Sequence, residues 1–486
     1  MFLGLDIGTS SVKAVLVDER GAIAAQASDS LTVSRPAPGF SEQDPAEWWQ
    51  GTVRAVRSLP AAARTRVEGV GLSGQMHGAT LLDANDRPLR PAILWNDGRS
   101  AQECVELEQR EPQSRAITGN LMMPGFTAPK LLWVARHEPD ILLHTACVLL
   151  PKDYVRLKLT GEKVSDMSDA SGTGWLNVGA RDWSDAMLAA TGLARAHMPR
   201  LVEGTAASGR IGAAASEQLG VPRALVAGGG GDNAASAAGL GVVSPGQAFL
   251  SLGTSGVLFV VTDRFRPNPA RAAHAFCHCL PARWHQMSVM LSAASALDWA
   301  AQLTGQRDLP ALVAAASVKG LSRRSPFFLP YLSGERTPHN DPCARGVFFG
   351  IGADTSAADL TLAVLEGVAL AFADGLDVLL EKGGAISEIS VTGGGARLPY
   401  WGELIAAALG RPLTYRIGSE VGAALGAARL GRLAARGEPV HAVCAAPLAE
   451  RVVEPDAAMS ALFAERRRTF VRLYQDLRNT FREHAA

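Results

Sequence analysis

The sequence predicts an α/β protein built from two related domains. Three observations support this prediction. The chain has 486 residues, too many for one ordinary core, strand-like and helix-like patterns alternate along it, and one strand–turn–strand pattern occurs in both halves. We expect a first domain at residues 1–243 and a second at residues 244–486. The boundary lies in a glycine-rich stretch that ends in Ser244–Gly246, where turn-forming residues separate two periodic segments.

The N-terminal segment predicts a β-hairpin that could bind phosphate. Phe2–Ile7 is expected to form a buried strand, 8–11 (GTSS) a tight turn, and 12–18 a second strand. Backbone N–H groups and hydroxyls in such a turn can converge on phosphate oxygens, and glycine permits close approach. Asp6 precedes the turn and could hold Mg²⁺ directly or through water, and Lys13 could add a positive charge. Taken alone, the turn is also compatible with a plain hairpin.

The same pattern recurs in the second half of the chain. Leu5–Val12 (LDIGTSSV) aligns with Leu250–Val257 (LSLGTSGV), and β-forming residues flank both copies. A spacing of about 245 positions indicates two related domains of similar size. Two Gly-Thr-Ser turns, one with an acidic neighbour, favour phosphate binding over two unrelated hairpins.

Two further glycine-rich segments follow predicted strands. Three glycines at 393–395 would suit close approach of adenine and ribose, although a simple strand-to-helix turn is equally compatible. Four glycines at 228–231 lead into Asp232 and Asn233, just before a small-residue helix at 234–239. A lone Asp at a helix start is usually an N-cap, but four glycines exceed what a cap requires. They predict a cleft carboxylate that accepts a hydroxyl proton, with Asn233 orienting the acceptor.

Other patterns exclude or weaken alternative sites. The chain has no Gly-Lys dipeptide and hence no Walker A loop, and Gly69–Gly74 matches Gly-x-Gly-x-x-Gly but is predicted to be a strand. His274–Cys279 contains metal-ligand residue types without a second pair at zinc-finger spacing, which favours an ordinary strand. Residues 456–483 predict an amphipathic helix, on which we expect Arg466–Arg468 to form a solvated face.

Composition and charge indicate which kinds of partner the protein can bind and in which cellular compartment it is found. Lys+Arg and Asp+Glu both number 47, so no net field attracts nucleic acid or an anionic membrane. No run of 18 apolar residues is present, and a carboxylate at Asp6 interrupts the region where a signal peptide has its apolar core. The six cysteines are sparse and typical of reduced thiols. We therefore expect a cytoplasmic protein that binds neither nucleic acid nor membrane.

Two longer patterns resemble the FGGY family of carbohydrate kinases. One is Gly125–His137 (GFTAPKLLWVARH), and the other runs from Gly346 through Gly350-Ile351 to Glu366. The resemblance extends in order over essentially the whole chain. It implies two ribonuclease-H-like domains, as in actin and hexokinase, with the active site in the cleft between them.

The resemblance also implies roles for individual residues. The first domain would bind the sugar and the second would bind ATP, with Asp232 as the general base and Asp6 as the second catalytic residue, which positions Mg²⁺. The sugar-binding residues would be Met76, His77, Asp232 and Asn233. The ATP-binding residues would be Thr9, Ser10, Lys13, Gly253, Thr254, Ser255, Gly394 and Gly395.

The segment Gly74–Gly78 (GQMHG) is similar to that of family members that phosphorylate D-xylulose, whereas glycerol-phosphorylating members carry Arg-Glu there. The expected reaction is therefore transfer from ATP to the 5-hydroxyl of D-xylulose, and a homodimer is the family-based expectation. Three alternatives stay open. They are a family member acting on ribulose, gluconate, glycerol or a pentitol, a non-catalytic sugar- or nucleotide-sensing protein, and an actin-like or chaperone ATPase. Asp6 and Asp232 argue against the second, and the Gly74–Gly78 segment argues against the third.

Overall fold

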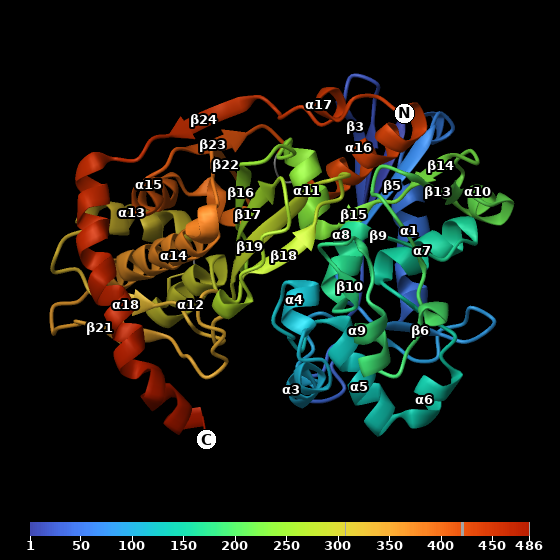
Figure 1. Cartoon of the computed structure of the whole chain (residues 1–486). Coiled ribbons are helices and arrows are strands. Elements are labelled where there is room, and N and C mark those ends of the chain that lie inside the picture. The colour runs from blue at the N-terminus through green and yellow to red at the C-terminus, as the bar shows by residue number, and fades with distance from the viewer. Residues whose placement is uncertain (307, 419–421, 486) are drawn as a thin grey trace.

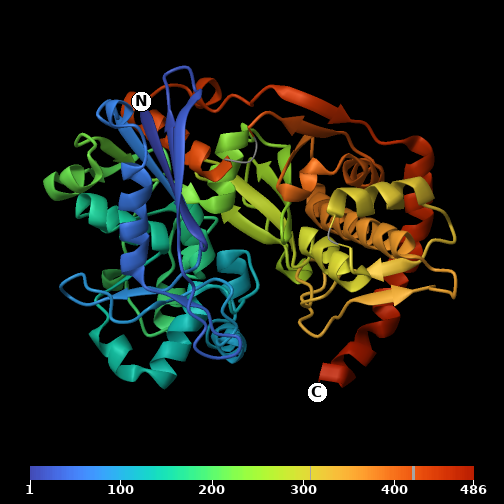
Figure 2. The same cartoon turned by 180° about the vertical axis from the view of Figure 1, so that it is seen from behind.

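The computed structural model describes residues 1–306, 308–418 and 422–485. Two mixed β-sheets, each of seven strands, form the centres of two lobes that lie side by side (Figure 1). The view from behind shows helices on the outer sides of both lobes (Figure 2). The two-domain α/β fold that the sequence predicts is confirmed.

The first sheet is built around the N-terminal hairpin. Its strand order is β13-β14-β5-β1-β2-β3, and β15 also pairs with β5. The strands are β1 (Phe2–Ile7), β2 (Ser11–Val17), β3 (Ile23–Ser30), β5 (Gly69–Gly74), β13 (Ala207–Arg210), β14 (Leu225–Ala227) and β15 (Gly230–Gly231). Strand β1 runs antiparallel to β2 and parallel to β5. The segment with the Gly-x-Gly-x-x-Gly letters is thus the strand β5, as predicted.

The second sheet repeats this arrangement. Its order is β18-β19-β17-β16-β22-β23-β24. The strands are β16 (Gln247–Leu252), β17 (Gly256–Thr262), β18 (His274–Cys277), β19 (Trp284–Met290), β22 (Glu388–Thr392), β23 (Leu413–Arg416) and β24 (Ala449–Val453). Strand β16 is antiparallel to β17 and parallel to β22, as β1 is to β2 and β5. The sequence repeat therefore corresponds to one topology used twice.

Two helices of small residues join the lobes. Helix α11 (Asp232–Leu240) packs against α16 (Gly422–Arg436), which comes from the second half of the chain but covers β1 and β5 of the first sheet. Glycine makes this approach possible, because a Cβ on Gly71 would lie 1.8 Å from the carbonyl oxygen of Ala427. The predicted boundary at residue 243 assigns α16 to the second domain, whereas α16 packs on the first sheet.

A hydrophobic cluster is also shared by the two lobes. Phe126 and Trp175 of the first lobe pack in one buried group with Phe276 and Met287 of the second. The other helices that position the site or its supports are α1 (Pro45–Arg57), α5 (Thr127–His137), α7 (Pro151–Thr160), α8 (Met167–Ala170), α12 (Ala294–Thr304) and α14 (Ala357–Leu380).

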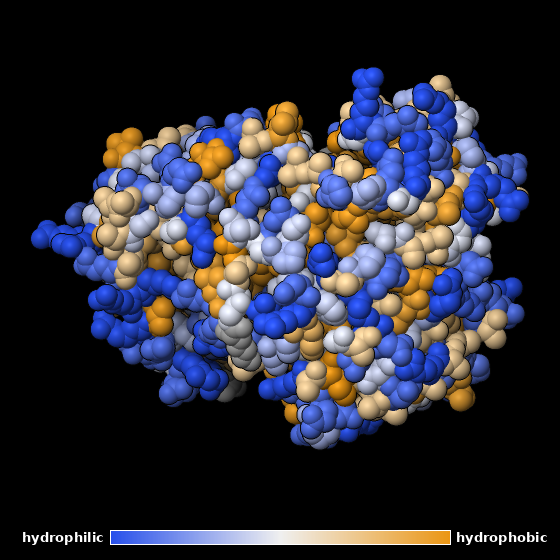
Figure 3. Space-filling model, turned by 45° about the horizontal axis from the view of Figure 1, so that its top comes forward, coloured by the Kyte–Doolittle hydropathy of each residue, from blue (hydrophilic) through white to orange (hydrophobic). Residues whose placement is uncertain are grey.

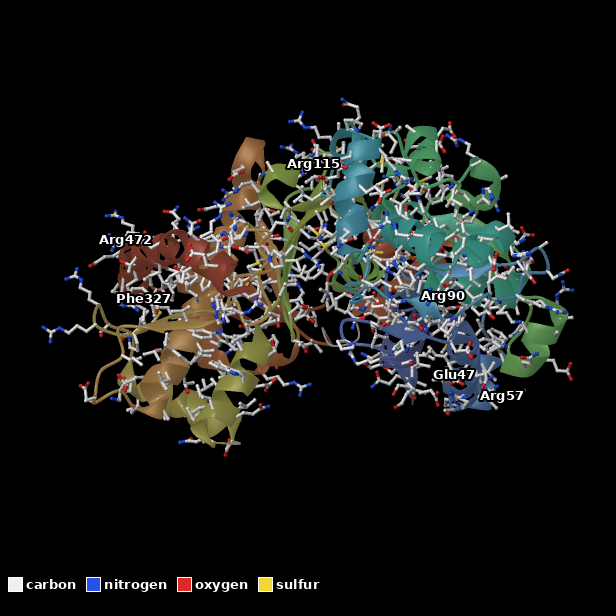
Figure 4. All side chains as sticks on the ribbon, turned by 90° about the horizontal axis from the view of Figure 1, so that it is seen from below. Glu47, Arg57, Arg90, Arg115, Phe327 and Arg472 are labelled. Carbon is white, nitrogen blue, oxygen red and sulfur yellow. The ribbon has the colours of Figure 1, made fainter. Side chains whose placement is uncertain are left out.

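The C-terminal helix α18 (Ala457–Ala485) confirms the predicted amphipathic helix, but the expectation of a solvated arginine face is wrong for two of the three arginines. Arg466 is buried and pairs with Glu366 of α14, and its guanidinium stacks 3.9 Å from the ring centroid of Phe327, which Figure 4 labels. Arg467 pairs with Asp374. These carboxylates lie about a hundred positions away in the sequence, so the local charge run gave no sign of them.

The surface is mixed in character. On the face shown in Figure 3, hydrophilic and hydrophobic residues are interspersed over both lobes. Among the described residues, no helix combines the length and the apolar character needed to cross a bilayer. All six cysteines are free thiols, as predicted, and five of them are buried.

Candidate active site

A cavity of about 190 Å³ lies between the lobes and brings together segments from both halves of the chain. Its lining includes Asp6, Lys13, Asn233, Ser251, Thr392 and Gly422. The β1–β2 hairpin, the start of α11, and the ends of β16 and β22 therefore meet at one point. The lining contains residues that precede the two Gly-Thr-Ser turns, Asp6 in the first half of the chain and Ser251 in the second.

The first Gly-Thr-Ser turn, our candidate phosphate turn, has opposite charges on the two strands that it joins. Asp6 lies directly opposite Lys13 in the β1–β2 register. Desolvation raises the pKa of the half-buried Asp6 carboxyl, and the charge of Lys13 opposes this rise. Lys13 and Ser10 are exposed beside the turn. A single carboxylate next to exposed donors suits a hydrated cation and the phosphates that the cation bridges.

The hydroxyl of Thr9 is engaged on the protein side of the turn. Its Oγ1 donates a hydrogen bond to Oε1 of Gln75 (2.8 Å) and accepts one from Nε1 of Trp95 (3.0 Å). The sequence assigned Thr9 to ATP but gave no role to Trp95 or to Gln75, although Gln75 lies in the Gly74–Gly78 segment. The hydrogen of the Thr9 hydroxyl is therefore already used within the protein.

The second turn and the triple glycine form the other side of the cleft. The carbonyl of Thr254 accepts bonds from the N–H of Ala293 (2.9 Å) and the hydroxyl of Ser295 (2.7 Å), which fixes the turn against the start of α12. Gly394 is exposed, and a Cβ there would meet no atom within 4 Å. Gly395 is buried instead, and a Cβ there would lie 2.5 Å from a side-chain carbon of Leu252. Gly394 thus leaves room for a ligand, whereas Gly395 is required for packing.

Asp232 begins α11 without acting as its N-cap. The N-cap is Gly231, and Oδ1 of Asp232 accepts from the backbone N–H (2.6 Å) and the amide Nδ2 (2.9 Å) of Asn233. Its second oxygen is left available to a substrate hydroxyl. Desolvation raises the pKa of Asp232 to about 6, the negative charge of Asp6 adds to this rise, and the bonds from Asn233 oppose it. A carboxylate with this pKa is ionised at neutral pH and still basic enough to accept a proton.

Met76 packs against Gly231, the residue that precedes Asp232, and His77 follows Met76 in the chain. The Met76 sulfur would be 2.8 Å from a Cβ on Gly231. His77 has a positive φ of 70° and stacks on Phe126 with ring centroids 5.1 Å apart. Burial lowers the pKa of His77 to about 3, so the ring is neutral. Its Nδ1 lies 2.6 Å from the carbonyl of Gly172, which makes Nδ1 the donor and leaves Nε2 as an acceptor for a sugar hydroxyl.

Lys130 supports the backbone of this segment. Its Nζ donates to the carbonyls of His77 (2.9 Å) and Gly125 (2.8 Å), and the side chain is fully buried. Burial lowers the pKa of Lys130 to about 7. Lys130 belongs to the Gly125–His137 pattern, to which sequence reasoning assigned no individual role. Its contacts show that this pattern holds His77 in its left-handed conformation.

The described residues contain no group of three or more His, Cys, Asp or Glu side chains placed to hold a metal ion. This includes the stretch around Cys277, which forms part of β18. Mg²⁺ bound with a nucleotide does not need such a group, because it takes most of its ligands from phosphates and water. Asp6, as a single half-buried carboxylate at the phosphate turn, fits that kind of binding.

Two protein-family models match the chain. They describe the N-terminal domain of the FGGY family of carbohydrate kinases, matched at residues 1–239, and its C-terminal domain, matched at residues 248–435.

Individual relatives match over nearly the full length. The xylulose kinase of Escherichia coli (strain K12) is 55% identical over 480 residues, covering 98% of this chain and 99% of the relative. The xylulose kinase of Klebsiella pneumoniae is 53% identical with the same coverage. The crystal structure of a xyloylose kinase from Brucella ovis is 50% identical and superimposes with a TM-score of 0.95 over 99% of both chains. The glycerol kinase of Plasmodium falciparum, at 18% identity, shares the fold with a TM-score of 0.89.

Proposed function

The chain belongs to the FGGY family of carbohydrate kinases, and we propose that it transfers the terminal phosphoryl group of ATP to D-xylulose, giving D-xylulose 5-phosphate and ADP. The observation that carries this proposal is the position of Asp232. The preceding residue, Gly231, packs against Met76, and the charge of Asp232 interacts with that of Asp6 at the first Gly-Thr-Ser turn. Burial raises the pKa of Asp232 to about 6, and one of its oxygens is available. The full-length similarity to xylulose kinases supports the choice of xylulose as acceptor.

The chemistry needs one proton transfer and one displacement. Asp232 accepts the proton of the 5-hydroxyl as the oxygen attacks the γ-phosphorus, the bond to the bridging oxygen breaks, and ADP leaves with that electron pair. Met76, His77 and Asn233 hold the sugar, and the neutral His77 accepts a hydroxyl hydrogen at Nε2. The N–H of Gly8 is used within the hairpin, where it donates to the carbonyl of Ser11. The backbone N–H groups of Thr9, Ser10 and Gly253–Ser255 align the phosphates.

The other residues of the ATP site have these proposed roles. Lys13 contributes positive charge, Gly394 leaves space for the nucleoside, and Gly395 lets the strand end pack closely. Mg²⁺, when bound, neutralises charge on the β- and γ-phosphates, and Asp6 would hold it. We assign sugar binding to residues 1–243 and ATP binding to residues 244–486. We extend the proposal to a cytoplasmic location, on the composition of the sequence, and to a homodimer, on family resemblance.

Initial rates of ADP release with a panel of sugars test the function. D-xylulose is expected to give a kcat/KM at least about tenfold above that of ribulose, gluconate, glycerol and pentitols, since loss of one fitted hydroxyl contact costs at least that factor. A higher value with another sugar would replace xylulose but keep the family activity. ATP hydrolysis at the same rate with and without any sugar would refute the kinase proposal and favour an ATPase.

A further inference from the structure

A chain of buried polar side chains connects the first phosphate turn to the sugar-binding segment. Gln75 bonds to Thr9 through Oε1 and to Gln43 through Nε2 (2.9 Å). Gln43 in turn donates to the backbone carbonyl of Thr9 (2.7 Å) and accepts from Nε1 of Trp48 (3.0 Å). Gln43 and Gln75 are almost fully buried. Two amides at the end of a sheet therefore hold one turn at both its side chain and its backbone.

The direction of each bond in this chain is fixed. Nε2 of Gln43 must donate, because both of its partners are backbone carbonyls, those of Thr9 and Thr32. Its Oε1 must then accept, so the Gln75 nitrogen is the donor to it. Oε1 of Gln75 is left as an acceptor, and the Thr9 hydroxyl has to donate to it. Trp95, which has only an N–H, agrees with this direction at the other side of Thr9.

A main-chain hydrogen bond also ties Gln75 to the strand that precedes the turn. The N–H of Gln75 donates to the carbonyl of Ile7 (2.9 Å), extending the β1–β5 ladder by one residue. Gln75 is thus fixed by its main chain to the strand that leads into the turn and by its side chain to the turn itself. The next residues, Met76 and His77, are those assigned to the sugar. A shift of Gln75 would change the distance between the phosphate turn and the sugar segment.

We propose that Gln75 is a positioning residue for the phosphoryl transfer, which aligns the Gly8–Ser10 turn with the sugar-binding segment by holding the hydroxyl of Thr9. The inference rests on the proposed kinase function. Phosphoryl transfer depends chiefly on alignment of the donor and the acceptor. Gln75 touches neither the reacting atoms nor, in this assignment, the sugar, so its effect is exerted through Thr9.

A double-mutant cycle tests the proposal. Gln75→Met removes the amide but keeps the length of the side chain, and Thr9→Val removes the hydroxyl. Gln75→Met is expected to lower kcat by about 10–100-fold while KM for ATP and for xylulose each change less than about threefold, because misalignment acts on the transition state. The double variant is expected to be faster than the product of the two single effects predicts, since both changes remove the Thr9–Gln75 bond. Each variant also loses one bond of its own, to Trp95 or to Gln43.

A matched control comes from a second tryptophan–glutamine pair. Nε1 of Trp49 donates to Oε1 of the surface residue Gln218 (3.1 Å), away from the site. Gln218→Met is therefore expected to leave kcat unchanged. A kcat of Gln75→Met within about twofold of the wild type would overturn the proposal. Independent effects of the two changes, whose factors multiply in the double variant, would overturn it as well.

A second variant, Gln75→Glu, keeps the proposal testable if Gln75→Met does not fold. In Gln75→Glu a protonated carboxyl can donate to Gln43 and accept from Thr9 as the amide does, whereas the ionised form cannot donate. Burial raises the pKa of such a group, so the kcat ratio of variant to wild type is expected to rise as pH falls from about 8 to about 6. The charged groups on the surrounding strands β1, β2 and β4 (Glu42–Gln43) are Asp6, Lys13 and Glu42. Those on helix α7 are Lys152, Asp153, Arg156 and Lys158, and all of them are common to both proteins. A ratio independent of pH would contradict the proposal.

The outcome is separable from an error in the assigned acceptor. If the wild type prefers another sugar, the cycle is measured with that sugar and still decides the role of Gln75. If no sugar stimulates ADP release, the kinase function and the role of Gln75 both fail.

Discussion

Asp6 and Asp232 flank the carboxyl end of the same strand, β5. Asp6 pairs opposite Ser73 from β1, and Asp232 directly follows Gly231, which pairs opposite Gly74 from β15. Desolvation is the main cause of the raised pKa of Asp232, and the charge of Asp6 contributes to it. The sheet thus places two carboxylates on either side of one strand, one that we propose for the cation and one that we propose for the proton.

The raised pKa predicts how activity depends on pH. Asp232 works as a base only when ionised, so kcat/KM is expected to fall tenfold per pH unit once the pH drops below about 6. A pH profile of initial rates in buffers of constant ionic strength measures this fall in kcat/KM at acidic pH. Thermal-unfolding curves recorded at each pH show whether the protein is still folded, and so separate acid denaturation from protonation of Asp232. An acid limb near the ordinary carboxylate value of about 4 would contradict the assignment.

Removal of the base tests the same residue directly. Asp232→Ala is expected to lower sugar phosphorylation by about 10²–10⁴-fold, the range typical of a general base, while ATP still binds. Isothermal titration with ATP and an assay of ADP release measure the two quantities. Asn233→Ala is the matched comparison, because it removes the side-chain bond to Asp232 but leaves the carboxylate. Turnover near that of the wild type in Asp232→Ala would exclude its role as base.

Asp6→Ala tests the other carboxylate. The variant is expected to need more Mg²⁺ for half-maximal rate and to have a lower kcat, because Asp6 would position the cation against the phosphates. It should also lower the pKa of Asp232, since one cause of the rise is removed. A titration of Mg²⁺ at saturating ATP measures the first effect. Asp18→Ala, on the turn after β2, serves as a control, and an unchanged metal titration in Asp6→Ala would refute the role of Asp6.

Local patterns were enough to predict much of the site. The two Gly-Thr-Ser turns and the glycines before Asp232 are contiguous in sequence, and the constraint that each places on the backbone is local. The repeat correctly predicted that the two turns belong to equivalent positions of two sheets. The family resemblance then supplied the prediction that the Gly74–Gly78 segment binds the sugar, which stays a prediction.

The supporting contacts could not be predicted from local patterns. Thr9 and Gln75 are 66 positions apart, and His77 and Lys130 are 53 apart, so their contacts depend on the pairing of β1 with β5 and on the packing of α5. The same reason explains the wrong expectation for Arg466, whose partner Glu366 lies 100 positions away. A glycine-rich turn or a run of charges depends on residues that are neighbours in the sequence. These bonds instead form only once the sheet and its helices have assembled.

The fit of Gly172 against His77 leads to a prediction about the sugar. A Cβ on Gly172 would lie 2.5 Å from Cε1 and 2.6 Å from Nδ1 of His77, closer than such atoms can approach. Gly172→Ala is therefore expected to displace the imidazole, break its bond to the carbonyl of Gly172, and raise KM for xylulose by about tenfold, the equivalent of one hydrogen bond. KM for ATP should stay the same, since the phosphate turns are not touched. Gly212→Ala is the matched control because its φ of −67° accepts alanine and the nearest atom is 3.7 Å away. An equal rise of both KM values in Gly172→Ala, or no rise at all, would show that His77 does not hold the sugar.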